Sequence, residues 1–376
     1  MPAPEVESTS SVPTRVLHIA SGDLWAGAEV QVYELVSQLH RSGVKCAVVL
    51  LNEGQLAARL RAAEISVTVI PESATSIWSS ARKLSVIIRQ FQPDVVHTHR
   101  FKENILGSIL SRLSGVPSTR TIHGAPEALS KSLKSRALQS LDDWVGRRLQ
   151  RCVVAVSNEL KKKLVPVFGT DHIKVIHNGI DANRARELAL GTTTGHANKK
   201  RIGFVGRLTQ VKRVDVFLRI AALAQSQLDT SLEAVVIGDG PLRPELEKLA
   251  KELGVNCEFA GFQSNCLPDI ASLDALLLTS DHEGLPIVAL EALSIGTPLL
   301  VHAVGGLPEL IQSEAQGYLV RSQRPEDYMP PLKTLLSRQR TEQQRPSLLP
   351  PDFSIHRTAI AYAELYLSIS TNSRGG

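Results

Sequence analysis

The sequence has few cysteines, few aromatic residues and no long apolar run. Its four cysteines are scattered and form no C-x-x-C pair, which argues against a zinc site or a disulfide framework and fits a reducing compartment. Without a run of about eighteen apolar residues, we expect no membrane-spanning segment. Residues 1–14 are polar and lack a basic segment, so they predict a disordered tail and not a signal peptide. These absences favour a cytoplasmic protein.

Positive charge is concentrated in the first half of the chain. Residues 1–185 contain 23 Lys and Arg against 16 Asp and Glu, whereas the remainder contains 19 against 21. The excess peaks between Lys131 and Lys163, in a helix-patterned stretch that could dock on anionic lipid at the inner face of a membrane. The alternative is a solvated helix face. Nucleic acid is not an expected partner, because aromatics make up only 4% and do not interleave with the charges.

Strand-like and helix-like segments alternate along the chain, and the pattern restarts near its middle. Apolar runs such as RVLHIAS (Arg15–Ser21) are followed by segments with apolar positions at helical spacing, such as VQVYELVSQLHRSG (Val30–Gly43). This alternation predicts βαβ units and mainly parallel sheets. With 376 residues there is room for two cores. The predicted fold class is α/β, with two Rossmann-like doubly wound domains facing each other across a cleft.

The composition also suggests where these domains begin and end. We expect an N-terminal domain over 15–185 and a C-terminal domain over 201–350. Residues 186–200 are rich in Thr, Gly and polar residues, which predicts a linker. Residues 351–376 include the amphipathic segment FSIHRTAIAYAELYLSIS, which predicts a helix packing back toward the N-terminal domain.

Two glycine-containing turns do not complete a dinucleotide or nucleotide motif. In Gly238–Gly240 the G-D-G follows a strand, but Arg243 replaces the third glycine of G-x-G-x-x-G and Pro241 breaks the pattern. FVGRL at Phe204–Leu208 is not followed by the G-K-[ST] of a Walker loop. No G-x-S-x-G elbow or catalytic-looking cysteine is present. We therefore expect no nicotinamide, flavin or covalent nucleophile chemistry.

The stretch SDHEGLPIVALE (Ser280–Glu291) combines features that suit a phosphorylated sugar. An apolar run ends at its first residue, a polar turn follows, and a helix is predicted from about Pro286 to Gly296. A helix N-terminus at the carboxyl end of a parallel strand is a common site for phosphates. Glu283 in the turn and Glu291 in the helix could accept hydrogen bonds from sugar hydroxyls.

Four further residues are candidates for the same site. Arg207 and Lys212, five residues apart beyond a strand, could neutralise a diphosphate without a metal, although both could also be solvated surface charges. Gly27, in the turn expected after the first strand, would let backbone N–H groups approach a phosphate, or it could simply make the turn. His123 follows a strand and could donate to a sugar hydroxyl, or it could be a structural histidine.

Three histidines raise the question of a metal. His97 and His99 share one face of a strand end, and with His123 they could form a metal cluster. Because no Asp or Glu stands nearby at ligand spacing, we predict no metal site.

Taken together, seven segments resemble one family of enzymes, the retaining glycosyltransferases of the GT-B fold, family four (glycosyl transferases group 1). They occur in the family's order and extend from Arg15 to about Val320. The segments are WAGAE (Trp25–Glu29), VVHTH (Val95–His99), TIHG (Thr121–Gly124), VIHNGID (Val175–Asp181), FVGRLTQVKRVD (Phe204–Asp215), IGDGP (Ile237–Pro241) and HEGLPIVALEA (His282–Ala292).

For the C-terminal domain, the resemblance implies a role for each matching position. Glu291 resembles the residue that holds the ribose hydroxyls of a sugar nucleotide, and Glu283 resembles the acid of the sugar subsite. Arg207 and Lys212 resemble the pair that binds the diphosphate and stabilises its charge as it leaves. The backbone expected to contact donor hydroxyls and phosphate is that of Gly284, Leu285, Pro286, Ile287 and Val288.

From the N-terminal domain, Gly27 resembles the glycine facing the diphosphate and His123 the histidine near the donor sugar. The resemblance implies retaining, hexosyl-type transfer from a UDP-, GDP- or ADP-sugar to a saccharide or lipid-linked acceptor, as in cell-surface polysaccharide or glycolipid synthesis. It implies no metal and no cofactor. The chemistry would be positioning and leaving-group stabilisation, with the cleft closing around the donor.

Four positions depart from the family's pattern. Ala26 stands where many members have a first glycine, and Arg213 stands where glycine often follows the lysine. Leu285 and Pro286 occupy positions where Phe and Gly are frequent, and Pro286 offers no N–H. These departures bear on the identity of the donor.

Two alternatives to transfer remain: a sugar-nucleotide epimerase of similar fold, and a non-catalytic protein that binds a sugar nucleotide.

Overall fold

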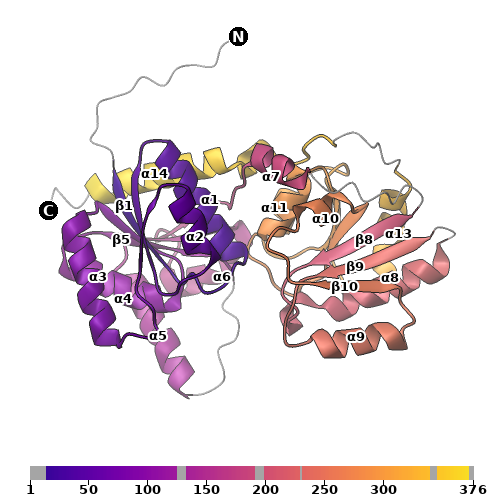
Figure 1. The fold of residues 1–376 in the computed structure, drawn as a ribbon, viewed down its shortest axis with the longest axis horizontal. Helices are drawn as coiled ribbons and strands as arrows, with labels where there is room; N and C mark the ends of the chain where they lie inside the picture. The colour runs from indigo at the N-terminus through magenta and orange to yellow at the C-terminus, as the bar shows by residue number, and fades with distance from the viewer. Residues whose placement is uncertain (1–13, 125–132, 191–198, 229–230, 339–344, 372–376) are drawn as a thin grey trace, which may run out of the picture.

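The structure is a computed structural model and describes residues 14–124, 133–190, 199–228, 231–338 and 345–371. In these residues the chain forms two parallel β-sheets that lie side by side, each flanked by helices (Figure 1). The two doubly wound α/β domains predicted from the sequence are confirmed. The predicted disordered tail, apart from its last residue, and the middle of the predicted linker lie outside the described residues.

The N-terminal domain contains a seven-stranded sheet with the order β3-β2-β1-β4-β5-β6-β7, in which every pair is parallel. Its strands are β1 (Arg15–Ala20), β2 (Lys45–Leu50), β3 (Ser66–Val69), β4 (Val95–Thr98), β5 (Ser118–Ile122), β6 (Cys152–Ala155) and β7 (Ile173–Val175). The helices that follow them are α1 (Gly27–Arg41), α2 (Gln55–Ala62), α3 (Ile77–Phe91), α4 (Phe101–Leu113), α5 (Leu133–Arg148), α6 (Asn158–Phe168) and α7 (Ala182–Ala189).

The C-terminal domain contains a six-stranded parallel sheet with the order β10-β9-β8-β11-β12-β13. Its strands are β8 (Lys200–Val205), β9 (Leu232–Ile237), β10 (Cys257–Gly261), β11 (Ala275–Leu278), β12 (Leu299–His302) and β13 (Gly317–Val320). Its helices are α8 (Val214–Gln227), α9 (Arg243–Glu252), α10 (Leu267–Ala271), α11 (Ile287–Ser294), α12 (Leu307–Leu310) and α13 (Pro325–Leu336), with a short 3-10 turn η1 (Gln210–Lys212).

Local chemistry explains why several of these elements begin where they do. The strands at the centre of each sheet are apolar and buried on both faces, as parallel strands between two helix layers must be. Ser157 caps α6 by accepting a hydrogen bond from the N–H of Leu160, and Asp181 caps α7 by accepting from the N–H of Arg184. In each sheet the strand order reverses beside the first strand, β1 or β8. A crevice therefore opens at the carboxyl ends of the strands, where such folds bind ligands.

Two boundaries differ from those expected. Helix α1 begins at Gly27, so this glycine is the first helical residue and not part of the preceding turn. Glu29 lies in the first turn of α1, where its negative charge interacts favourably with the positive end of the helix dipole. This interaction stabilises a helix that begins directly after Ala26. Helix α7 continues to Ala189, so the first four residues of the predicted linker are helical.

The C-terminal helix α14 (Ile355–Thr371) belongs to the N-terminal domain by its packing. It follows a 3-10 turn, η2 (Pro351–Phe353), and lies along that domain in Figure 1. Its buried stripe, which includes Leu365 and Tyr366, packs into the same apolar cluster as Val32 of α1. The repeat of apolar residues at three- and four-residue spacing explains this burial. Among the described residues, no helix is both long and apolar enough to cross a membrane.

Replacing Leu365 by alanine is expected to destabilise the N-terminal domain by about 2–5 kcal/mol, because the side chain is fully packed and its loss leaves a cavity. Thermal and denaturant unfolding measure the loss. Leu367 lies on the same helix but is 45% exposed, so Leu367→Ala is the matched control and should cost no more than about 0.5 kcal/mol. Equal losses in the two variants would contradict the packing of α14 described here.

Candidate active site

A cavity of about 860 Å³ lies between the two domains. Its walls are mainly loops that follow strand carboxyl ends, together with the first turns of α1 and α11. Every residue predicted for the site lines this cavity: Gly27, His123, Arg207, Lys212, Glu283, Gly284, Leu285, Pro286, Ile287, Val288 and Glu291. The fold therefore brings all the predicted residues together, while the role of each stays a prediction.

The turn after β11 leads into α11 as the sequence suggested. Pro286 is the N-cap, with extended backbone angles, and the helix begins at Ile287. At the N-cap a missing N–H removes no bond from the helix, which explains why proline fits this position. The N–H groups of Ile287 and Val288 belong to the first turn, whose donors have no acceptor within a helix. They are placed to bind an anion in the cavity.

Glu283 and Lys212 form an ion pair in the cavity wall. The Lys212 ammonium donates to a Glu283 carboxylate oxygen over 2.7 Å, and the Ser280 hydroxyl donates to the same oxygen over 2.7 Å. The Glu283 side chain is only 8% exposed, so this pair is shielded from water and stronger than a surface ion pair. The lysine from one loop and the acid from the next are thereby fixed relative to each other before any ligand binds.

Arg207 is exposed at the cavity and, within the described residues, makes no ion pair or hydrogen bond through its guanidinium. The loop that carries it is anchored at its far end by Arg213. That residue adopts the left-handed conformation with φ of 48°, which explains why glycine is frequent at this position in the family. Here the strain is offset by ion pairs from its guanidinium to Asp215 and Asp281.

The glycines of the G-D-G turn are explained by backbone packing. A Cβ atom at Gly238 would lie 1.9 Å from the carbonyl oxygen of Gly206, and one at Gly240 would lie 2.5 Å from that of Leu208. The loops after β8 and β9 therefore touch through their main chains, and no side chain fits between them. This close packing accounts for the glycines without a dinucleotide.

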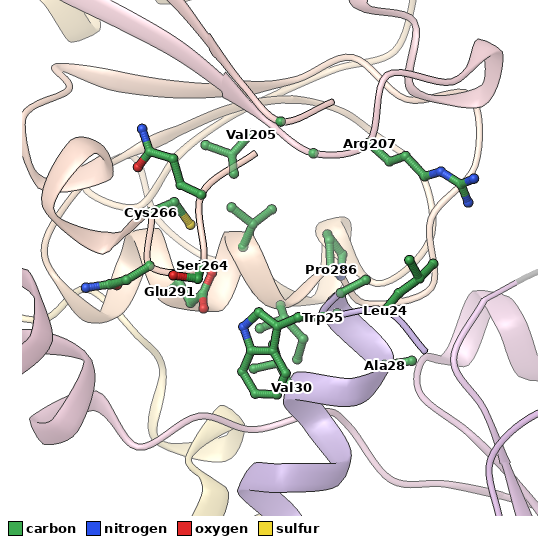
Figure 2. A pocket seen from close by; sticks show the side chains of 18 of the residues that line it. Leu24, Trp25, Ala28, Val30, Val205, Arg207, Ser264, Cys266, Pro286 and Glu291 are labelled. Atoms are coloured by element: carbon green, nitrogen blue, oxygen red, sulfur yellow. The ribbon is translucent and has the colours of Figure 1, made fainter. Parts of the chain in front are cut away.

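Glu291 lies in the cavity wall on helix α11. Figure 2 shows Glu291 and Cys266 toward one end of the cavity and Arg207 toward the other. Burial, and to a smaller extent the charge of Glu34 across the cleft, raise the pKa of Glu291 to about 7. Burial also raises the pKa of Glu34, despite the Arg184 guanidinium 3.6 Å from its carboxylate. The charges of the two acids thus act on each other, and Arg184 pairs with Glu34.

The two domains touch through main chain at the cavity. A Cβ atom at Gly284 would lie 1.9 Å from the carbonyl oxygen of His123, so the C-terminal turn reaches the N-terminal strand end only because residue 284 is glycine. Asn178 donates to the carbonyl of Leu285 over 2.8 Å, and Glu309 accepts from both Asn158 and His177. These contacts join the two domains beside the cavity.

Behind His123 lies a buried cluster of three more histidines. His97 and His99 share one face, as expected, with ring centroids 4.2 Å apart, and β1 adds His18. Burial lowers the pKa of His18 to about 3 and that of His123 to about 4, and it lowers the pKa values of His97 and His99 well below 6.5. All four rings are therefore neutral at pH 7. One ring nitrogen each from His18, His97 and His99 lies within 4.8 Å of the others.

Several cavity residues were not predicted from the sequence. The loop after β10, including Phe262, Ser264 and Cys266, forms part of the wall, and α1 contributes Glu34. Trp25, noted only within a motif, lies in the cavity wall with the Arg59 guanidinium 4.4 Å from its ring centroid. The β10 loop could have been predicted from the sequence, because it follows the carboxyl end of a strand beside β9. Parallel sheets bind ligands at the carboxyl ends of their strands.

Known proteins place the chain in a family. The glycosyltransferase family 4 description matches residues 25–184, and that of glycosyl transferases group 1 matches residues 193–346. A D-inositol 3-phosphate glycosyltransferase of Thermomonospora curvata is 29% identical over 284 residues, covering 67% of this chain and 64% of the relative. An uncharacterized glycosyltransferase of Methanocaldococcus jannaschii is 31% identical, covering 62% and 63%. The matched region thus spans just under two thirds of these relatives' length.

Among solved structures, Anabaena HepE in complex with UDP-glucose superimposes with a TM-score of 0.77 at 20% identity, covering 94% of this chain and 99% of that one. WaaG, a glycosyltransferase involved in lipopolysaccharide biosynthesis, gives a TM-score of 0.64 at 16% identity, covering 96% and 100%. The two sheets with a site between them are therefore the GT-B fold of glycosyltransferases. The chain belongs to glycosyltransferase family 4, the group 1 glycosyl transferases.

The raised pKa of Glu291 predicts a pH-dependent stability. Because this carboxyl binds its proton more tightly in the folded chain than in the unfolded one, its contribution to stability falls as pH rises from about 4.5 to about 7. At pH 8, Glu291→Gln should therefore be more stable than the natural chain, by about 3 kcal/mol, and the difference should vanish below pH 4.5. Denaturant unfolding across pH measures it, with the exposed Glu252→Gln as control.

Proposed function

We propose that this chain is a retaining glycosyltransferase. It transfers a sugar from a nucleotide-sugar donor to a saccharide or lipid-linked acceptor, without a metal or another cofactor. The observation that carries the proposal is the composition of one cavity. Arg207, which makes no ion pair within the part of the chain that the structure describes, a Lys212–Glu283 pair and a helix N-terminus converge there, and His123 of the opposite domain lines the same cavity. Family membership supports transfer in preference to other chemistry.

The arrangement suggests how the donor would lie. The diphosphate would lie near the first turn of α11, with Arg207 and Lys212 supplying the positive charge that a metal provides elsewhere. The ribose hydroxyls would face Glu291, and the transferred sugar would lie between Glu283 and His123. The donor is thus held by both domains, and positioning rather than covalent chemistry would supply most of the rate acceleration.

Retention requires the acceptor to attack from the side of the leaving group. The bond between the anomeric carbon and the phosphate oxygen breaks, the bond to the acceptor oxygen forms on the same face, and the acceptor proton passes to the departing diphosphate. In the structure, the Lys212 ammonium donates to a Glu283 carboxylate oxygen over 2.7 Å. The same ammonium can keep this bond and still neutralise a phosphate, because it has three donors.

We expect Lys212→Ala to lower turnover by about 10²–10³, because it removes a charge that stabilises the leaving diphosphate. Glu283→Gln should also lose turnover, since it breaks the pair that holds Lys212 in place. Circular dichroism and unfolding should show that both variants are folded. Lys248 is 79% exposed on α9, so Lys248→Ala is the matched control and should have unchanged activity. Wild-type rates in both site variants would contradict the assignment.

The donor can be identified by screening UDP-, GDP- and ADP-sugars for thermal stabilisation and for hydrolysis. UDP-sugars come first, since two similar proteins are described with UDP-glucose and with a UDP-galactose donor. Incubation with donor alone distinguishes the rival activities. Conversion of the sugar nucleotide to its epimer would identify an epimerase, and binding without hydrolysis, epimerisation or transfer would identify a non-catalytic binding protein.

The basic helix α5 supports peripheral contact with an anionic membrane, such as the inner face of the cytoplasmic membrane. Three apolar side chains are exposed on this helix, Leu138, Leu141 and Trp144, at 39%, 40% and 47%. Arg147 and Arg148 are exposed near them at the end of the helix. An exposed apolar stripe beside cations is the pattern of a helix that lies at a membrane surface, where a lipid-linked acceptor for polysaccharide or glycolipid synthesis would be found.

At low salt, the chain is expected to co-sediment with vesicles containing anionic phosphatidylglycerol and not with neutral phosphatidylcholine vesicles. Trp144→Ser together with Arg147→Gln and Arg148→Gln should weaken binding at least tenfold, and added salt should weaken it further. Trp78 of α3, which is 84% exposed and lies on a different helix, provides the control variant Trp78→Ser. Failure to bind anionic vesicles at low salt would contradict the proposed membrane contact.

A further inference from the structure

Three of the buried histidines form a single hydrogen-bonded row that ends at the cavity. Nδ1 of His18 lies 3.2 Å from Nε2 of His99, and Nδ1 of His99 lies 3.3 Å from Nε2 of His123. The rings are nearly parallel along the row, with interplanar angles of 12° and 25°. Only His123 lines the cavity, whereas His18 is fully buried in the sheet.

A neutral imidazole carries one proton, so the three rings cannot choose their tautomers independently. If His99 donates from Nδ1 to His123, its bare Nε2 must accept a proton from Nδ1 of His18. If His99 donates instead from Nε2 to His18, its bare Nδ1 must accept from Nε2 of His123. Any other combination places two lone pairs or two protons against each other. The row therefore has two consistent states, and all three rings change together.

The two states differ in which end of the row carries an unpaired N–H group. Among the described residues, Nε2 of His18 and Nδ1 of His123 are both buried and have no hydrogen-bond partner. In one state the unpaired N–H belongs to His18, inside the sheet, where a ligand cannot reach it. In the other it belongs to His123, whose ring lines the cavity although its Nδ1 is buried. A buried N–H group without a partner is costly in either state, but only the one on His123 lies beside a cavity that can hold an acceptor, and this position favours the second state.

We infer that His18 and His99 are positioning residues that fix His123 as the tautomer protonated on Nδ1, so that its ring offers a hydrogen-bond donor to a substrate oxygen. The identity of the substrate, a sugar nucleotide, rests on the proposed function. The tautomer of His123 does not depend on it. A sugar hydroxyl or phosphate oxygen at this position would complete a bond that the ligand-free protein leaves unmade. The row thus prepares His123 for an acceptor of hydrogen bonds.

His97 is in the same cluster but outside the row. Its Nδ1 lies 2.7 Å from the Tyr366 hydroxyl and its Nε2 lies 2.8 Å from the Thr121 hydroxyl, which in turn lies 2.6 Å from the Tyr362 hydroxyl. Both of its nitrogens are therefore occupied by hydroxyl partners. This arrangement also argues against a metal held by His18, His97 and His99, because a metal would have to displace these bonds and the bond between His18 and His99.

The tautomer can be measured on the full chain without substrate. With histidine labelled in ¹⁵N, the ring nitrogen shifts at pH 7.5 distinguish the two neutral tautomers, and loss of one set of signals in His123→Gln assigns that residue. We expect His123 to be neutral and protonated on Nδ1. Finding it protonated on Nε2, or on both nitrogens, would overturn the inference. Zn²⁺ added after chelator treatment should leave the row unchanged, and metal-shifted signals from His18 and His99 would also overturn it.

Variants of His18 test the origin of the preference. His18→Leu removes the donor to His99 and should convert His123 to a mixture of tautomers, whereas His18→Asn retains an N–H that can donate to Nε2 of His99 and should preserve the Nδ1–H form. Tyr366→Phe removes a hydroxyl from the same cluster but not from the row, and should change nothing. Equal mixtures in the Leu and Asn variants, or an equal change in Tyr366→Phe, would overturn the role of His18.

Activity provides the second measurement. His18→Leu should lower kcat/KM about threefold to tenfold, the effect of one net hydrogen bond, while leaving affinity for the free nucleoside diphosphate unchanged. A general loss of structure would lower both and would overturn a positioning role. If the tautomer is as expected but no sugar nucleotide binds, the inference stands and the proposed function fails. If transfer is observed but His123 carries its proton on Nε2, the proposed function stands and the inference fails.

Discussion

The close approach of two main chains is the constraint on which the site depends. The turn at Gly284 rests against the carbonyl of His123 with no room for a side chain, and this contact fixes the distance between the two sheets. On one side it places the start of α11 and Glu283, and on the other it places His123. Asn178 and Glu309 reinforce the contact through polar bonds between the domains. A site divided between two domains is complete only while this contact is made.

Electrostatics divides the cavity into two regions of different character. One end has cations, with Arg207 unpaired among the described residues and Lys212 shared with Glu283. The other end has Glu291 opposite Glu34, and burial raises the pKa of both. A ligand that carries phosphate charge at one end and hydroxyl donors at the other would relieve both imbalances. The electrostatics of the cavity therefore favour a ligand with that pattern of charge.

Local patterns predicted the strands, most helices and part of the cavity wall, because each depends on spacing along one segment. Helix α6 was not separated from the basic, helix-patterned stretch that ends at Lys163, because its lysines and Pro166 obscure its apolar stripe. The wall formed by the β10 loop was not predicted, because no charged motif marks it. His18 lies in an ordinary apolar strand in the sequence. Only the pairing of β1 with β4, which sets His18 opposite His97, reveals its part in the histidine cluster. Such pairings are set by the whole fold.

The chain passes between the domains twice, and the two passages are joined. After β7 the backbone crosses at Ile180 toward α7, which packs against the C-terminal domain, and it returns through Phe353 into α14. Ile180 donates to the carbonyl of Phe353 and accepts from the N–H of Ile355, so the two crossings form a short parallel ribbon. A single tether would allow one domain to rotate freely about the other, whereas a paired ribbon permits bending about one axis and resists twisting. The paired crossings therefore restrict how the two half-sites can move relative to each other.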